Sequence, residues 1–310
     1  MGILKEATGV VWMATTADFE HGSRTTVAGS DIGLPFIELV GRTESSHARF
    51  PLGEHDHGAA YEICYLKRGS QTFTIGSDSF TIHGGEDFIA YPWERHGTGH
   101  EPLGKSILYW TILDPSAAGG GTAGDTRAGN GVAAATVHVL RAIQDAGIRC
   151  ARTSEAVDRF FELILDSWDS DYPVRDAAIQ NAILSVTLDL YRVGTEAPEA
   201  SLSEEIASVA EWIETHPSCR PTIAAMAEIA GLSESHFRSR FEAELGMPPA
   251  EYAMRVRVGL AEQALAGGTA VTDVAFDLGF ISSQYFATVF KQFTGRRPSD
   301  VWKMPQRNLR

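Results

Sequence analysis

Three histidines and one glutamate in the N-terminal half have the types and spacing of a ligand-binding site. His55, His57 and Glu62 lie within eight residues of one another, and His96 follows in a later segment. Alternate residues of a strand share a face, so His55 and His57 point the same way. Glu62 and His96 reach the same point if their strands are neighbours. Imidazole and carboxylate groups bind divalent metals such as zinc, nickel, manganese or iron, and they also hydrogen-bond organic ligands.

Two aromatic residues stand close to His96 in the sequence. Tyr91 and Trp93 precede it by five and three residues. An aromatic ring beside polar groups suits stacking on a sugar, and packing in the core is the alternative. The candidate effector-binding residues are His55, His57, Glu62, Tyr91, Trp93 and His96. If these residues bind an organic effector, no cofactor is required. The alternative is that the three histidines and Glu62 hold a divalent metal.

The spacing of these residues resembles the two motifs of the cupin barrels. The first motif reads His-x-His-x4-Glu-x6-Gly from His55 to Gly69 and matches in full. The second departs from the family pattern, because Pro92 lies four residues before His96 instead of five and Glu94 stands near the expected glycine. The resemblance implies an antiparallel β-barrel that senses a small polar molecule such as a sugar.

The last third of the chain carries a repeated pattern. Residues 224–241 and 271–291 each contain an amphipathic segment, a glycine, a serine-rich stretch and a second segment with aromatic residues one helical turn apart. Gly231 and Gly279 permit a sharp turn. The serines that follow suit a helix start, because their hydroxyls accept hydrogen bonds from free amides. Two helices joined in this way place the second in the DNA major groove, so the repeat predicts two helix-turn-helix units.

The polar faces of the second helices predict the DNA contacts. Arg238 is the candidate for bidentate readout of guanine and Gln284 for readout of adenine, while Thr288 suits a thymine methyl or a phosphate. Further arginines are expected to contact phosphates, which position the protein without specifying sequence: Arg255, Arg257, Arg296 and Arg297. The full set of candidate DNA-binding residues is Ser235, Arg238, Ser239, Arg257, Ser282, Ser283, Gln284, Thr288 and Lys291.

Over residues 206–303 the chain resembles the AraC/XylS family of bacterial transcription regulators. The shared residues are Gly231, Leu232, Ser233, Leu245, Gly246, Pro249, Tyr252, Arg257, Ala261, Leu265, Ala275, Leu278, Gly279, Phe280, Tyr285, Phe286, Phe290, Lys291, Gly295 and Pro298. Ser239, Glu242 and Thr288 depart from the family pattern, and each departure removes a positive charge. The resemblance implies a ligand-responsive regulator that binds double-stranded promoter DNA and forms a homodimer. It also implies contact with RNA polymerase if the regulator is an activator.

Short β-rich runs in the first part of the chain must position the histidine cluster. They lie at 61–66, 71–75, 79–83, 87–91 and 106–113. Their close spacing between Gly, Asp and Pro turns favours an antiparallel barrel or sandwich. In the first run, Glu62, Cys64 and Leu66 are expected to point inward, and the residues between them outward.

Helical periodicity follows the strands. We expect helices over 132–146, 154–168 and 174–193, and the third has an apolar stripe that suits either packing on the barrel or dimerisation. Flexible linkers are expected at 117–131 and 194–203. A long helix over 249–266 should join the two helix-turn-helix units.

The predicted fold class is therefore α+β with two domains. A cupin-like antiparallel barrel spans 1–116, a helical linker region spans 132–193, and an all-α domain with two helix-turn-helix motifs spans 204–304.

Composition and charge limit the class of protein. The net charge is −14, but residues 1–200 carry −12 of it and residues 220–310 carry +2, so the acidic excess lies outside the predicted DNA-binding part. The chain lacks an apolar run long enough for a membrane helix. Its first residues lack the long apolar region that a signal peptide needs, and its three cysteines suit a reducing cytoplasm. We expect a cytoplasmic regulator and not an enzyme. The alternative is a metal-dependent cupin enzyme or metal sensor with a DNA-binding tail.

Overall fold

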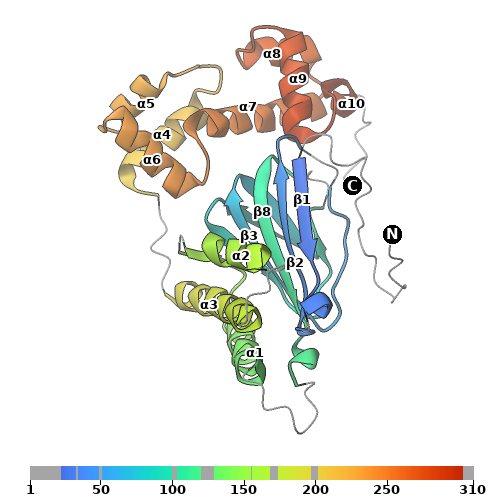
Figure 1. The fold of residues 1–310 in the computed structure, drawn as a ribbon. Helices are drawn as coiled ribbons and strands as arrows, with labels where there is room; N and C mark the ends of the chain where they lie inside the picture. The colour runs from blue at the N-terminus through green and yellow to red at the C-terminus, as the bar shows by residue number, and fades with distance from the viewer. Residues whose placement is uncertain are drawn as a thin grey trace.

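The protein combines a sheet domain with a helical C-terminal domain (Figure 1). The structure, a computed structural model, describes residues 22–32, 34–48, 51–99, 103–119, 129–154, 156–167, 174–196 and 202–302. The predicted α+β class with two domains is confirmed. Of the predicted linkers at 117–131 and 194–203, residues 120–128 and 197–201 lie outside the described residues, as does the N-terminus, while 117–119, 129–131 and 194–195 belong to η3, α1 and α3.

Antiparallel strands form two sheets in the first domain. The larger has the order β1-β2-β8-β3-β6-β9 and the smaller the order β5-β4-β7. The strands are β1 (Gly22–Val27), β2 (Ile37–Ser45), β3 (Tyr61–Arg68), β4 (Ser70–Ile75), β5 (Asp78–His83), β6 (Glu86–Ala90), β7 (His96–Gly97), β8 (Ser106–Leu113) and β9 (Cys150–Arg152), with short 3-10 turns η2 (Gly29–Ile32) and η3 (Pro115–Gly119). The five predicted strands are confirmed within two residues at their ends, whereas β1, β2, β7 and β9 were not predicted.

The two faces of β3 enter different cores. Cys64 and Leu66 pack between the sheets with Phe73 and Phe88, whose rings stack at 4.4 Å. Tyr61, Ile63 and Tyr65 pack on the opposite side, under the helices. The predicted alternation is confirmed, and it turns Glu62 toward the interior of the barrel.

Three helices cover the outer face of the larger sheet (Figure 1). They are α1 (Gly129–Asp145), α2 (Ala156–Ser167) and α3 (Arg175–Thr195). The apolar stripe of α3, with Ile179, Ile183 and Leu190, is buried in the same core as Tyr65. This stripe therefore packs inside the first domain, and the region predicted as a helical linker is part of that domain.

The C-terminal helices form two small cores along one long helix. They are α4 (Glu204–Thr215), α5 (Ile223–Ile229), α6 (Glu234–Leu245), α7 (Pro249–Ala266), α8 (Val271–Asp277), α9 (Ser283–Thr294) and α10 (Pro298–Trp302). The start of α7 packs with α4, α5 and α6 through Ala253, and its end packs with α8, α9 and α10 through Ala261 and Leu265. Helix α7 has the predicted bounds of 249–266.

Both helix-turn-helix turns form as the sequence predicts. Gly231 and Gly279 adopt positive φ angles of 65° and 72°, which a glycine tolerates without steric cost. Ser233 accepts a hydrogen bond from the His236 amide at the start of α6, and Ser282 accepts one from the Tyr285 amide at the start of α9. The two units therefore share a left-handed glycine at the turn and a serine cap on the second helix.

Candidate functional site

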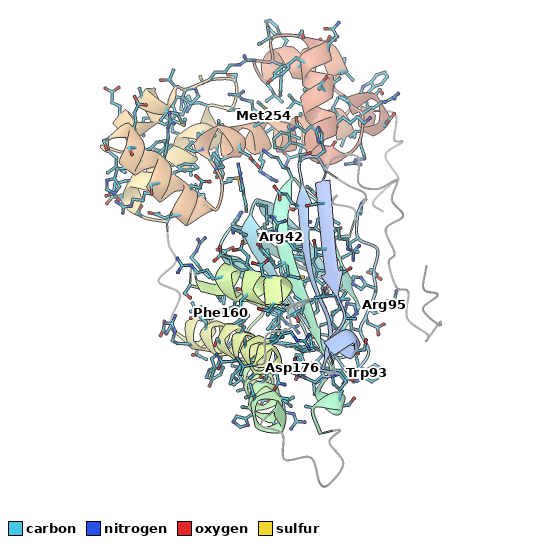
Figure 2. All side chains as sticks on the ribbon, viewed as in Figure 1. Arg42, Trp93, Arg95, Phe160, Asp176 and Met254 are labelled. Carbon is cyan, nitrogen blue, oxygen red and sulfur yellow. The ribbon has the colours of Figure 1, made fainter. Side chains whose placement is uncertain are left out.

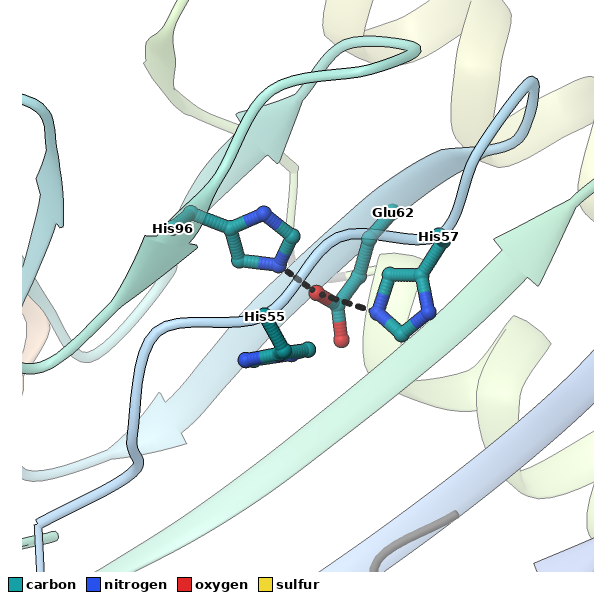
Figure 3. Close-up of side chains that lie close together, drawn as sticks. All are labelled: His55, His57, Glu62 and His96. Atoms are coloured by element: carbon teal, nitrogen blue, oxygen red, sulfur yellow. Dashed lines mark hydrogen bonds and ion pairs between the residues drawn. The ribbon is translucent and has the colours of Figure 1, made fainter. Parts of the chain in front are cut away.

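The structure brings His55, His57, Glu62 and His96 together (Figure 3). His55 and His96 pair through two backbone hydrogen bonds of 2.9 Å. Glu62 reaches the same point from β3, and one ligand atom from each of the four residues lies within 4.8 Å of the others. Glu62 and His96 are buried, whereas His55 and His57 are half-buried, so the cluster opens toward solvent on the histidine side.

Backbone carbonyls orient two of the imidazoles. Nδ1 of His55 lies 2.9 Å from the Gly53 carbonyl, and Nδ1 of His96 lies 3.0 Å from the Glu94 carbonyl. A carbonyl only accepts, so each Nδ1 carries the hydrogen. In a neutral imidazole the opposite Nε2 is then a bare lone pair. That of His55 is available for a ligand, whereas Nε2 of His96 faces Glu62.

The contact between His96 and Glu62 needs a positive charge. His96 Nε2 lies 2.6 Å from Glu62 Oε2, and a lone pair facing a carboxylate at this distance requires a proton or another cation between them. Burial alone would raise the pKa of Glu62, but hydrogen bonds and charge from His57 and His96 outweigh it and lower that pKa. Burial likewise opposes protonation of His96, yet Glu62 raises its pKa. The carboxylate is therefore ionised and paired.

The two aromatic candidates lie in different places. Tyr91 is buried under the helices, where its hydroxyl donates to the carbonyls of Ile143 and Ile148 at 3.3 and 2.7 Å. Its hydroxyl faces α1 and not the histidine cluster. Tyr91 is therefore not placed to make the predicted contact with an effector in the cluster. Trp93 is 74% exposed and its amide donates to the carbonyl of Gly58, the residue after His57, at 2.6 Å. Trp93 therefore stands at the rim of the cluster, toward the end of the sheet away from the C-terminal helices (Figure 2).

The predicted DNA-facing residues lie mostly on exposed helix surfaces. Helix α6 exposes Ser235, Arg238 and Ser239, while Phe237 and Phe241 are buried on its other side. Helix α9 exposes Gln284, Thr288 and Lys291 and half-exposes Ser283. Ser282, also exposed, uses its hydroxyl to cap α9. The exposed polar faces of the two helices agree with the predicted sides.

Arg257 is the exception among the predicted contacts. It is only 6% exposed, and its guanidinium donates to the carbonyls of Pro217 and Cys219 in the loop before α5. Burial, together with the nearby Arg220, lowers its pKa. Arg257 fixes this loop onto α7, so its guanidinium is held inside the domain and does not face outward as the predicted phosphate contact requires.

Two of the other arginines expected at phosphates also have partners. Arg255 donates to the Lys105 carbonyl at 2.8 Å, and Arg296 pairs with Glu262. Arg297 stays exposed.

Two family models together match most of this architecture. The AraC-like ligand binding domain matches residues 40–185, which contain most of β2, the strands β3 to β9, the histidine cluster and much of the helical layer. The helix-turn-helix domain matches residues 226–304, which contain α6 to α10. The chain belongs to the AraC family of transcription regulators. This AraC-family protein is a ligand-responsive regulator that binds DNA, as its sequence predicted.

Individual relatives agree with the family. The transcriptional regulator YisR of Bacillus subtilis is 24% identical over 260 residues, which cover 81% of this chain and 88% of YisR. An AraC-like transcription regulator of Streptomyces antibioticus is 32% identical over 101 residues, which cover 32% of this chain and 33% of that protein. Among solved structures, ToxT from Vibrio cholerae covers 93% of this chain and all of its own at 10% identity, with a TM-score of 0.34.

The AraC-family regulator has direct contacts between its sensor domain and both DNA-reading units. Arg152, after β9, donates to the Ala243 and Glu244 carbonyls at the end of α6 at 3.0 and 2.8 Å. Lys105 pairs with Glu251 of α7 at 3.0 Å. These contacts, which we call the domain junction, were not predicted, because they join residues about 90 to 150 positions apart and leave no local pattern.

A third contact of the domain junction involves α9. The amide of Ala48 donates to the Gln292 carbonyl at 2.7 Å. A cavity of about 700 Å³ adjoins this contact, lined by His47 and Ala48 on one side and by Thr288 and Lys291 on the other. The segment that follows β2 therefore borders the side of α9 that carries Thr288 and Lys291.

In the part of the chain that the structure describes, no helix is long and apolar enough to cross a membrane.

Proposed function

We propose that a small polar effector, such as a sugar, binds at His55, His57, Glu62 and His96 and changes how α6 and α9 meet promoter DNA. The convergence of these four side chains within 4.8 Å in the ligand-binding domain supports the proposal. Imidazole nitrogens and a carboxylate are suitable partners for hydroxyl groups. The exposed ring of Trp93 at the rim offers a flat face for stacking on a sugar ring.

A divalent metal in the same cluster is the second candidate. The gathering of three imidazoles and one carboxylate within 4.8 Å favours it, because divalent metals bind these groups. The hydrogen bonds from Nδ1 of His55 and His96 to carbonyls are of the kind that orient histidine ligands. Zinc, nickel, manganese or iron would be held by the three Nε2 atoms and Glu62, and the ion would act as a Lewis acid toward an effector oxygen. We propose sensing and not catalysis, since the relatives are regulators.

A covalent connection supports coupling between the cluster and DNA. The segment 46–57 begins at Ser46 and Ala48, which contact Gln292 of α9, and ends at His55 and His57. An effector shifts a conformational equilibrium only if it binds one arrangement better than the other. A ligand that moves His55 or His57 would therefore act close in the sequence to Ser46 and Ala48, which contact α9.

Thermal melting of the intact protein separates the candidates. It is measured with a panel of sugars, before and after metal chelation, for the native chain and for Glu62→Gln, which keeps the shape and removes the charge. A sugar that raises the Tm of the native chain only, with no effect of the chelator, indicates the organic effector. A chelator that lowers the Tm of the native chain only indicates the metal. A cluster that responds to neither treatment would be purely structural, and the proposal would be wrong.

We also propose that the regulator acts as a homodimer. Large apolar side chains are exposed on the outer sides of α2 and α3, among them Leu163, Leu188 and Tyr191. A second copy of the chain is the partner that the family resemblance favours. An activator would in addition contact RNA polymerase.

A further inference from the structure

The two helix-turn-helix units differ by one residue at the start of the second helix. In the first turn, Leu232 alone separates Gly231 from the capping residue Ser233. In the second, Phe280 and Ile281 separate Gly279 from the capping residue Ser282. The second unit therefore has one additional position directly before its DNA-reading helix.

Hydrogen bonds identify Ile281 as the additional residue. The Leu232 amide donates to the Ala227 carbonyl, and the Phe280 amide donates to the Ala275 carbonyl, each at 2.9 Å. Leu232 and Phe280 are therefore equivalent, and both pack against the core of their unit. Since Phe280 performs the packing role, with its ring 4.9 Å from that of Phe286, Ile281 is not needed for the core.

Ile281 instead projects into solvent. Its side chain is 78% exposed, as one of the most exposed large apolar residues in the described part of the chain. It directly precedes Ser282, the capping residue of α9, and lies three residues before the exposed Gln284. Residues at the start of the second helix of such a motif contact base edges in the major groove. The position thus places an aliphatic side chain where DNA bases are read.

We propose that Ile281 reads a thymine in the operator through its C5-methyl group. Among the four bases, only thymine presents an apolar group in the major groove. Removing this methyl and the Ile281 side chain from water together is favourable. A contact with deoxyribose or phosphate would also shelter Ile281, but it would not depend on the base.

Replacement of thymine by deoxyuridine tests this contact, because uracil lacks only the methyl group. Operators are first selected from random duplexes with the full chain, and each thymine is then replaced singly. For the native chain, one position in the half read by α9 should show a Kd about fourfold weaker with uracil. Ile281→Ala should bind the thymine and uracil duplexes equally. Arg238→Ala, altered on α6, should keep the uracil effect as the matched control.

Three results would overturn the proposal. One is that the native chain shows no uracil-sensitive position in that half of the operator. The others are that Ile281→Ala keeps the sensitivity to uracil, or that it weakens the binding of all duplexes by the same factor. The Tm of Ile281→Ala should equal that of the native chain, because the side chain is exposed. Failure to select any operator would instead contradict sequence-specific DNA binding itself, which is a separate result.

Discussion

Asp87 is a buried acid that has no part in the histidine cluster. Its side chain is fully buried on β6, Oδ2 accepts a hydrogen bond of 2.5 Å from the Thr153 hydroxyl, and Oδ1 has no partner among the described residues. Burial, with added repulsion from Asp189 and Glu86, raises the pKa of Asp87 to about 8. The carboxyl group is therefore neutral over most of the physiological range.

This raised pKa predicts how stability depends on pH. The ordinary pKa of an unfolded aspartate is about 3.9, so the folded state binds the proton more tightly. The contribution of Asp87 to stability is complete below about pH 4 and is lost as the pH rises to about 8. Asp87→Asn should remove this loss. The variant should therefore gain free energy of unfolding over the native chain, and this gain should be larger at pH 8 than at pH 5 by at least about 1.4 kcal/mol. Urea denaturation at both pH values measures the difference, and an equal difference at both would contradict the raised pKa.

The sequence predicts the position of some side chains correctly and of others incorrectly. The inward direction of Glu62 was predictable, because strand alternation fixes it once the strand is recognised. Arg257 was not, since its acceptors at Pro217 and Cys219 lie about 40 residues away and an arginine in a basic domain suggests a surface role. Tyr91 similarly depends on carbonyls of α1 and the turn after it. The roles of these two residues depend on hydrogen-bond acceptors that are distant in the sequence, so the residues next to them do not reveal these roles.

At the scale of elements, the outer side of α3 predicts self-association. Leu188 and Tyr191 are 48% and 37% exposed, while the opposite side of α3 is buried. Burying a leucine in an interface contributes about 1.5–3 kcal/mol, so Leu188→Glu should weaken dimerisation at least about tenfold. Sedimentation velocity over a range of concentrations measures this. Leu188→Met, which keeps the apolar surface, serves as the control. If all three proteins sediment alike, the dimer does not use α3.

The elements themselves were only partly predictable. Strands β3, β4, β5, β6 and β8 are short runs rich in β-forming residues between turn residues, and such runs are recognisable. Strand β2 contains Gly41, which weakens a strand pattern. The structure explains this glycine, because a Cβ there would lie 2.2 Å from the indole of Trp110 on the neighbouring strand. Trp110 on β8 occupies the space that Gly41 on β2 leaves open. The glycine is therefore explained by the pairing of two strands and not by the sequence around it.

At the scale of the whole molecule, Arg152 predicts how firmly the two domains are held. It pairs with Glu86 at 2.8 Å and donates to the carbonyls of Ala243 and Glu244 at the end of α6, where a positive charge is favourable. Arg152→Ala should cost about 1–3 kcal/mol at the domain junction and let the C-terminal domain move. Small-angle scattering should then show a larger radius of gyration. Arg159→Ala, on the exposed side of α2, is the control, and an unchanged radius in Arg152→Ala would show that other contacts suffice.

The domain junction also contains a contact between backbones. The Gly69 amide donates to the Gly246 carbonyl at 3.3 Å, and a Cβ on Gly84 would lie 2.5 Å from that same carbonyl oxygen. With no side chain between them, the two domains already touch at the limit of van der Waals contact. The direction of any signal through this point follows: a bound effector cannot press the domains closer together here, so it can only separate them or slide one across the other.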